Sequence, residues 1–390
     1  MSLFIEAAPT PTRPLQGEAL VRRLEDWNLL GRGGAGFPVA RKWRSVRERA
    51  HGNAVVLANG AEGEPLSRKD RTLMVERPDL VIDGGLLAAQ AVGARDIIFY
   101  LGAEHRNAIA SMRSALARRP EAALRRARLV EAPPGYVSGE ESAAVHFVND
   151  GDARPTTTPS RPFERGVDGK PTLVQNVESL AMAASIARGD DGSTSLVTAS
   201  GAVRRGGVYE MPFDASVAEV AGASGGTTRP VQAVLLGGYF GNWAPAHDVW
   251  PVSMAPSALR SRSLTLGCGV LHFLGADTCG VDATARVMTY LASQSARQCG
   301  PCVFGLGAIA AACDRLADRS AQADDLRRLA RWSGEVAGRG ACKHPDGASQ
   351  LLRSALRVFA DDLEAHQHRR CLVTPVAVAS AWRAPVEAVA

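Results

Sequence analysis

Short apolar segments alternate with helix patterns through the first half of this 390-residue chain. Residues 54–58, 96–101 and 127–131 are predicted strands, and residues 80–92 and 107–118 are predicted helices. Strands that alternate with helices in this way form a largely parallel sheet, so the order predicts an α/β fold. Ligands of such sheets bind at the carboxyl ends of the strands. The polar loop at 59–71, which follows the first strand, is therefore a candidate binding segment.

A glycine-rich stretch at 31–43 is a second candidate. It holds four glycines in its first six residues. Glycine lets the backbone adopt φ > 0 and approach a flat or anionic ligand, and bare N–H groups before a helix form an anion cradle. Gly31, Gly33 and Gly36 fit G-x-G-x-x-G, but that fingerprint follows a strand in dinucleotide folds. Here it follows a predicted amphipathic helix at 20–30, with Trp27 on the apolar side. A glycine-rich helix cap is the alternative interpretation.

Two further polar stretches lead into predicted helices. Residues 135–143 place two adjacent carboxylates before a helix, where they either contact a ligand or compensate the helix dipole. Residues 169–180 read as a turn and an N-cap, or as a binding loop.

The pattern changes along the rest of the chain. Short strand-like segments at 197–203, 207–211 and 233–237, with a helix at 217–223, predict a small α+β module. Helices are predicted at 283–293, 304–318, 324–336 and 347–366. We expect an α/β domain at 1–190, the small module at 191–262, a helical domain at 263–372 and a tail at 373–390.

All seven cysteines lie in the last third of the chain: Cys268, Cys279, Cys299, Cys302, Cys313, Cys342 and Cys371. An odd, clustered set favours a metal or iron–sulfur site over a disulfide framework. Only four of the 45 basic residues are lysines; three of them lie inside motifs discussed here, and Lys343 directly follows Cys342. A compact ammonium is not interchangeable with a guanidinium, so these lysines mark positions of interest.

Composition excludes several classes of protein. The net charge of +5 is spread along the chain without a Lys/Arg block among aromatics, which speaks against nucleic-acid binding. The sequence has no apolar run of about 18 residues for a transmembrane helix, and its first residues lack the basic region of a signal peptide. We expect a cytoplasmic protein, at most peripheral to a membrane complex.

Five motifs in one order carry a resemblance to a known family: 31–43, 59–71, 136–142, 169–180 and 279–342. Over residues 20–366 the chain resembles the flavoprotein (F) subunits of NADH-quinone oxidoreductases and the related flavin subunits of hydrogenases and formate dehydrogenases. The resemblance implies a Rossmann-like FMN domain, then a small β-grasp module of the soluble-ligand-binding type, then a C-terminal helical bundle with one [4Fe-4S] cluster.

The resemblance also implies a set of site residues. The FMN and dinucleotide contacts map onto Gly31, Arg32, Gly33, Gly34, Ala35, Lys42, Asn59, Glu62, Tyr136, Gly139, Glu140, Glu141 and Asn176. Phe37 and Glu64 match positions at the nicotinamide dinucleotide and are the expected catalytic residues. A ring can stack on Phe37, and the Lys42 ammonium can stabilise charge on a reduced flavin.

Several positions depart from the family pattern. Ala61 replaces an aspartate, Ser45 replaces an aromatic residue, and Gln175 replaces the first of two asparagines. The stretch before Gly169 is about two residues short. We therefore expect an intact FMN site and weak or altered nicotinamide binding.

The iron–sulfur motif departs further. Cys299, Cys302 and Cys342 match three ligands, but Ala296 stands where the first cysteine of C-x-x-C-x-x-C belongs. Such clusters normally take four thiolates. A [3Fe-4S] cluster, a [4Fe-4S] cluster with another fourth ligand, a zinc ion and no metal all stay open. His344 is one substitute ligand, or a solvated surface residue.

Three functions fit these observations. The first is FMN-dependent NAD(P)H oxidation, with single electrons leaving through the cluster to a ferredoxin or a partner subunit, which could itself belong to a membrane-bound complex. The second is a ferredoxin-linked electron relay that binds FMN without oxidising NADH. The third is a structural subunit whose sites have decayed.

Overall fold

The computed structural model describes residues 14–156, 160–189 and 193–373. Most of the predicted tail at 373–390 therefore lies outside the described residues. The chain divides into two compact units. The first comprises residues 1–63, 67–197 and 210–213, and the second comprises 64–66, 198–209 and 214–390.

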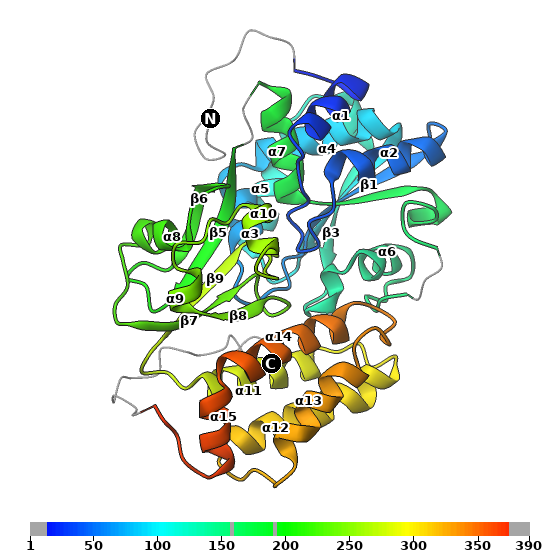
Figure 1. The fold of residues 1–390 in the computed structure, drawn as a ribbon. Helices are drawn as coiled ribbons and strands as arrows, with labels where there is room; N and C mark the ends of the chain where they lie inside the picture. Colours follow the sequence, from blue (N-terminus) through cyan, green and yellow to red (C-terminus); the bar gives the residue numbers. More distant parts are fainter. Residues whose placement is uncertain (1–13, 157–159, 190–192, 374–390) are drawn as a thin grey trace. The chain divides into compact units, whose positions relative to one another are not determined.

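The first unit alternates strands and helices, as predicted. Its elements are α1 (Gly17–Asp26), α2 (Val39–Ala50), β1 (Ala54–Gly60), α3 (Lys69–Glu76), α4 (Pro78–Val92), β2 (Ala94–Gly102), α5 (Arg106–Ala117), β3 (Ala127–Ala132), α6 (Glu141–Asp150), β4 (Thr172–Asn176) and α7 (Val177–Ala187), drawn in Figure 1. The three predicted strands are confirmed, but β4 is absent from the sequence-based prediction because its five residues run directly into α7. The expected place of Trp27 is wrong: α1 ends one residue earlier, and Trp27 is 38% exposed beneath Arg23.

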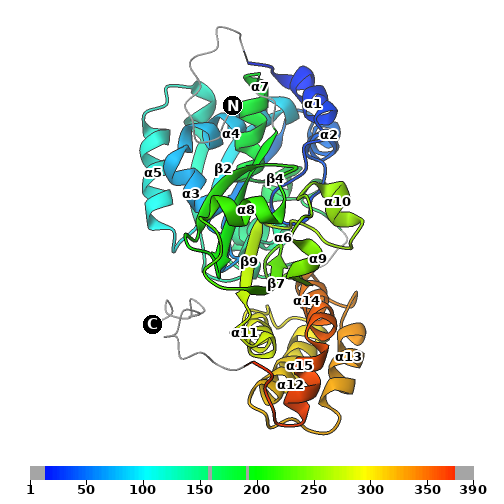
Figure 2. The ribbon, with the colours of Figure 1, turned by 60° about the vertical axis from the view of Figure 1, so that its left-hand side comes forward.

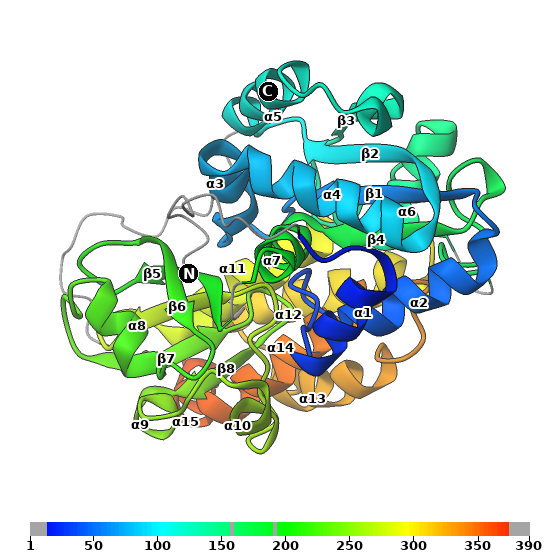
Figure 3. The same ribbon diagram turned by 90° about the horizontal axis from the view of Figure 1, so that it is seen from above.

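The sheet of this unit has the strand order β3-β2-β1-β4, and every pair is parallel (Figure 3). Side chains alternate between its two faces. Ile98 and Tyr100 belong to the core cluster that includes Ala144 of α6. Ile97 and Phe99 face the other way, where a Cβ on Gly85 of α4 would touch both. Helices therefore cover both faces of a parallel sheet.

Helices α4 and α7 pack unusually closely. A Cβ at Gly84 of α4 would lie 2.1 Å from the carbonyl oxygen of Leu180 in α7. Only glycine fits at this contact.

The second unit contains a mixed five-stranded sheet of order β6-β5-β9-β7-β8. Its elements are β5 (Thr194–Gly201, whose first residues belong to the first unit), β6 (Gly207–Pro212, whose last residues belong to the first unit), α8 (Val217–Ala223), β7 (Val231–Leu236), β8 (Asn242–Pro245), α9 (Ala246–Val249), α10 (Pro256–Arg260) and β9 (Val270–Gly275). β5 and β9 are parallel, whereas β7 is antiparallel to β8 and β9. β9 was not expected, because a short apolar run has no periodicity that separates a strand from a buried helix. It extends this sheet beyond residue 262.

The remainder of the second unit is helical (Figure 2): α11 (Gly280–Ser293), a π-helix (Pro301–Leu306), α12 (Gly307–Ala317), α13 (Asp325–Glu335), α14 (His344–Val358) and α15 (Ala360–Gln367). The predicted helix at 347–366 is two helices separated at Phe359. The chain is thus a mixed α/β protein with a parallel sheet and many helices. Among the described helices, none is long and apolar enough to cross a membrane.

Candidate functional site

The glycine loop at 31–37 is closed at its base and open at its tip. The Gly31 N–H donates to the Phe37 carbonyl at 2.9 Å, and Leu30 bridges to Pro38. Gly34 and Gly36 have φ of +106° and +62°, and a Cβ on either would meet no atom within 4 Å. The tip therefore offers glycine backbone and open space, as a cofactor cradle requires. The helix-cap alternative is wrong, because α1 ends with Trp27 as its C-cap.

Four predicted cofactor residues meet at the carboxyl ends of β1 and β4. Asn59 of β1 and Asn176 of β4 are register partners. The Asn59 amide donates to the Gly139 carbonyl at 2.8 Å. A Cβ on Gly33 would lie 3.3 Å from the Cβ of Asn176. Residues from four separate motifs thus surround one point at the edge of the sheet where α/β proteins bind ligands.

The segment 59–71 comes equally close to the segment that carries Tyr136. A Cβ at Gly63 would lie 2.9 Å from the carbonyl oxygens of both Gly135 and Tyr136. Glycine at position 63 is needed for this approach, so the structure brings the predicted binding loop next to the segment that carries Tyr136.

Two predicted cofactor carboxylates cap helices. Glu62 accepts hydrogen bonds from the backbone N–H groups of Asp70 and Arg71, at 2.9 and 3.0 Å, in the first turn of α3. Glu140 caps α6 and accepts from the N–H groups of Ser142 and Ala143. Burial raises the pKa of Glu140. The hydrogen bonds of Glu140 therefore agree with the alternative interpretation, in which it compensates a helix N-terminus. Glu62 and Glu140 both hold their loops in place.

Lys42 and Glu141 stay accessible at the same site. Their side chains form an ion pair at 3.0 Å and are 25% and 35% exposed. Glu141 thus holds the Lys42 ammonium near the glycine loop, and the ammonium stays accessible to a ligand.

A network of buried charges, absent from the sequence-based prediction, lies behind the glycine loop. Glu178 of α7 accepts from Arg32 at 3.2 Å and pairs with Lys69 at 2.9 Å. Lys69 also pairs with Asp70 at 2.6 Å, and Asp70 accepts from the Asn176 amide at 2.7 Å. The Arg32 side chain is buried and paired with Glu178, so it has a structural role. The rare lysine at position 69 was the one signal of this network in the sequence.

The network fixes the charge states of its members. Burial alone would lower the pKa of Lys69, but the charges of Asp70 and Glu178 raise it. Burial would raise the pKa of Glu178, but Arg32 and Lys69 hold it below its ordinary value. Burial dominates at Asp70 and raises its pKa. These charges tie the glycine loop, α3 and α7 together.

The two expected dinucleotide residues lie in different surroundings. Phe37 is 44% exposed, and the Arg41 guanidinium lies 5.6 Å from its ring centre. Ser45, in place of an aromatic residue, donates back to the Arg41 carbonyl. Glu64 belongs to the second unit, where its buried carboxylate accepts from the Tyr239 N–H at 2.8 Å. Their shared role at a dinucleotide stays a prediction.

The three cysteines predicted to bind a cluster come together in the second unit. The Cys302 N–H donates to the Cys299 carbonyl at 3.0 Å. Burial, together with the nearby Cys299 and Cys342 sulfurs, raises the pKa of the Cys302 thiol to about 12. Cys302 lies in the π-helix, a rare turn that often marks functional sites. The donor set therefore suits a thiolate-bound cluster.

His344 stays a candidate for the missing fourth ligand, through one of its two ring nitrogens. This histidine is 2% exposed, and its Nε2 donates to the Leu291 carbonyl at 2.7 Å. The expectation of a solvated surface residue is therefore wrong. Nε2 is the donor of this bond, so Nδ1 is the ring nitrogen that carries the lone pair. Beside Ala296, the Ser295 hydroxyl is buried without a hydrogen-bond partner among the described residues.

Comparisons with known proteins agree with this geometry. A family model described as the Nuo51 FMN-binding domain matches residues 24–185. A second, the NADH-ubiquinone oxidoreductase-F iron-sulfur binding region, matches residues 282–366. The NADH-quinone oxidoreductase F 2 subunit of Rhizobium meliloti (strain 1021) is 30% identical over 91% of this chain and 90% of its own length. The chain belongs to the family of NADH-quinone oxidoreductase F subunits.

Other relatives of this family member extend the comparison. The NADH-quinone oxidoreductase F subunit of Escherichia coli (strain K12) is 28% identical over 92% of this chain and 87% of its own length. A crystal structure of an NAD+-reducing [NiFe]-hydrogenase superposes with a TM-score of 0.81 at 30% identity, over 90% of this chain and 62% of the hydrogenase chain. Members of the family are oxidoreductase-type flavoproteins, and this one carries both the FMN-binding domain and the iron–sulfur region.

Proposed function

We propose that this member of the F-subunit family oxidises NAD(P)H with FMN and passes single electrons through an iron–sulfur cluster to a ferredoxin or a partner subunit. The convergence of Gly33, Asn59, Gly139 and Asn176 at one sheet edge carries the proposal. It rests also on the family's proposed layout, with a Rossmann-like FMN domain, a β-grasp module and a helical bundle along residues 1–190, 191–262 and 263–372.

Each side chain then has a physical task. The open backbone at Gly34 and Gly36 would receive the phosphate or ring edge of FMN. The partly exposed Lys42 ammonium would stabilise negative charge on the ring. The Asn59 amide orients the segment at Gly139. Bound flavin supplies the conversion between two-electron and one-electron transfer.

The cluster site is proposed at Cys299, Cys302 and Cys342. Three buried or half-buried thiols would supply three of four ligands, and the fourth would come from solvent, a partner chain, His344 or the Ser295 hydroxyl. One incompletely ligated iron would make such a cluster labile to oxygen.

Ser45 favours a second candidate, the relay that binds FMN without oxidising NADH. Its hydroxyl bonds to its own helix and leaves Phe37 as the aromatic side chain expected to stack on a dinucleotide. Loss of one stacking partner costs about 1 kcal/mol, or roughly fivefold in affinity.

Anaerobic titration of the FMN-loaded protein with NADH separates the two candidates. We expect NADH to bleach the flavin absorbance, with a dissociation constant above the sub-micromolar range. Glu64→Gln is expected to slow bleaching while FMN stays bound, and Glu48→Gln, whose side chain is 71% exposed, is the matched control. A flavin that dithionite or reduced ferredoxin bleaches, but NADH does not, establishes the relay instead.

A further inference from the structure

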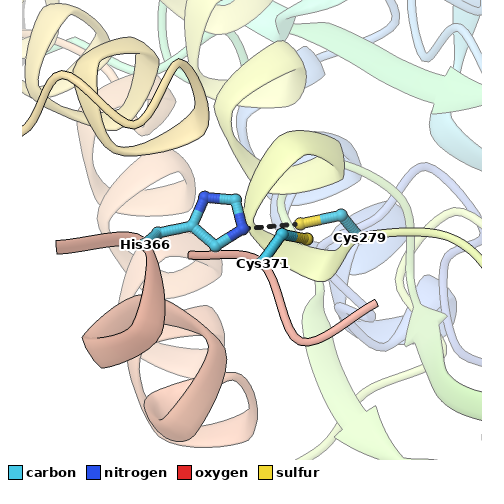
Figure 4. A group of neighbouring side chains, drawn as sticks. All are labelled: Cys279, His366 and Cys371. Carbon is cyan, nitrogen blue, oxygen red and sulfur yellow. Dashed lines mark hydrogen bonds between the residues drawn. The ribbon is translucent and has the colours of Figure 1, made fainter. Parts of the chain in front are cut away.

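A second group of metal-binding side chains lies in the helical part of the second unit. The ligand atoms of Cys279, His366 and Cys371 all lie within 4.8 Å of one another (Figure 4). Cys279 precedes α11, His366 lies near the end of α15, and Cys371 follows that helix. Cys279 and His366 are buried, and Cys371 is half-buried. The group shares no residue with the predicted cluster ligands.

The hydrogen bonds of His366 define which nitrogen can bind a metal. Its Nδ1 lies 2.9 Å from the Leu316 carbonyl, which can only accept, so Nδ1 carries the proton. Nε2 therefore has a lone pair, and it lies 3.3 Å from the Cys279 sulfur. Orientation of a ligating histidine by a backbone carbonyl is a recurrent feature of metal sites. The imidazole is thus fixed with its lone pair toward both thiols.

We propose that Cys279, His366 and Cys371 bind one zinc ion that ties the segment after α15 to the start of α11. Two thiolates and an imidazole suit Zn²⁺, which has no redox chemistry and would not intercept electrons from the flavin. In a tetrahedral site with these ligands, the ligand atoms lie about 3.3–3.8 Å apart. The three ligand atoms lie within 4.8 Å of one another, so they need to move only slightly closer together to bind zinc.

The fourth position has a candidate donor in the same segment. Asp282 lies in the first turn of α11, and one of its carboxylate oxygens is buried without a hydrogen-bond partner among the described residues. A structural zinc site takes four ligands, so Asp282 or a water completes this set.

Element analysis of the full chain tests the proposal. The protein is prepared without a histidine tag, with FMN and iron in place, and is equilibrated with zinc and then dialysed against metal-free buffer. We expect one zinc per chain besides the iron. Zinc-edge X-ray absorption is expected to give two sulfurs at about 2.3 Å and nitrogen at about 2.0–2.1 Å.

Alanine variants assign the zinc to these residues. Cys371→Ala is expected to lose the zinc and keep its iron and FMN. Cys313→Ala is the matched control, since Cys313 is a buried thiol of α12 outside the group. His366→Ala provides a second variant, should one of them fold poorly.

Three results would overturn the proposal. They are a wild-type chain that retains no zinc, a Cys371→Ala variant that retains it, and a Cys279–Cys371 disulfide found by non-reducing mass spectrometry in the protein as isolated. Loss of FMN or iron with zinc intact would count against the proposed function and leave the zinc site standing.

Discussion

Lys69 illustrates how single residues shape the candidate site. Its side chain is 1% exposed and has carboxylate oxygens of Asp70 and Glu178 within 2.9 Å. A buried charge of this kind is tolerated only with its partners present, because an isolated buried ion is very costly. Through Glu178 and Arg32, the ammonium fixes α7 and the glycine loop of the proposed cofactor site.

Glu178→Gln should therefore destabilise the first unit strongly. Removal of one partner from a buried ion pair costs about 3–5 kcal/mol. Denaturant unfolding of the FMN-free protein measures the effect. Glu335→Gln, which breaks an exposed pair with Arg331, should change stability by at most about 1 kcal/mol. Equal changes in the free energy of unfolding of the two variants would mean that the buried pair stabilises the protein no more than the exposed one.

Gly33→Val should abolish FMN binding without unfolding the chain. The added branch would enter the space between the glycine loop and Asn176, where a Cβ already comes within 3.3 Å. Flavin content per purified chain is the measurement. Gly222→Val is the matched control, because Gly222 is an exposed helical glycine with open space around it. A yellow Gly33→Val protein with full FMN would show that the cofactor lies elsewhere.

At this scale the sequence was informative where the chemistry is local. Glycines at φ > 0 and asparagines near strand ends can be recognised in a short motif, so Gly34 and Asn59 could be predicted as site residues. The contact between Lys69 and Glu178 joins residues more than a hundred positions apart. No spacing rule reveals such a pair, and the capping role of Glu62 depends likewise on where the chain turns back.

At the scale of elements, β9 is a strand that the sequence pattern did not predict. It lies between β5 and β7 and places His272 opposite Ser200, whose hydroxyl is 3.0 Å from the imidazole Nδ1. Its apolar run has no helical or alternating period because all six residues are buried. Strands β1 to β3 were predictable because turn residues and helices separate them.

His272 should make stability depend on pH. Burial lowers its pKa to about 4, against about 6.5 in the unfolded chain. Between these values the unfolded state binds the proton and the folded state does not, so stability falls as pH drops. The loss reaches about 3 kcal/mol by pH 4. In urea unfolding from pH 7 to pH 4, the midpoints of wild type and of the exposed control His51→Gln should fall together, whereas those of His272→Gln should fall less. Parallel curves for all three proteins would contradict this prediction.

For the whole molecule, the cluster ligands decide how electrons leave. We expect anaerobically prepared protein to contain iron and to give a low-temperature EPR signal. A signal in the oxidised sample identifies a [3Fe-4S] cluster, and one after dithionite identifies a [4Fe-4S] cluster. Cys302→Ala should remove the signal, whereas Cys313→Ala, at a buried thiol of α12, should keep it.

Silent samples without iron but with stoichiometric FMN would contradict the cluster. The flavin would then have to pass electrons directly to a docked protein. Which of these holds is not encoded in the spacing of cysteines, because Ala296 leaves the fourth ligand to another part of the chain, to solvent or to a partner.

The place of β4 beside β1 affects how the protein is made. β1 is complete at Gly60, yet the strand that covers its second edge ends at Asn176. A ribosome must therefore synthesise more than a hundred further residues before that edge is paired. During this interval the apolar edge of β1 is exposed on the nascent chain, where chaperones or aggregation compete for it. The proposed cofactor site includes both Asn59 and Asn176, so we expect FMN to bind only after the sheet is complete.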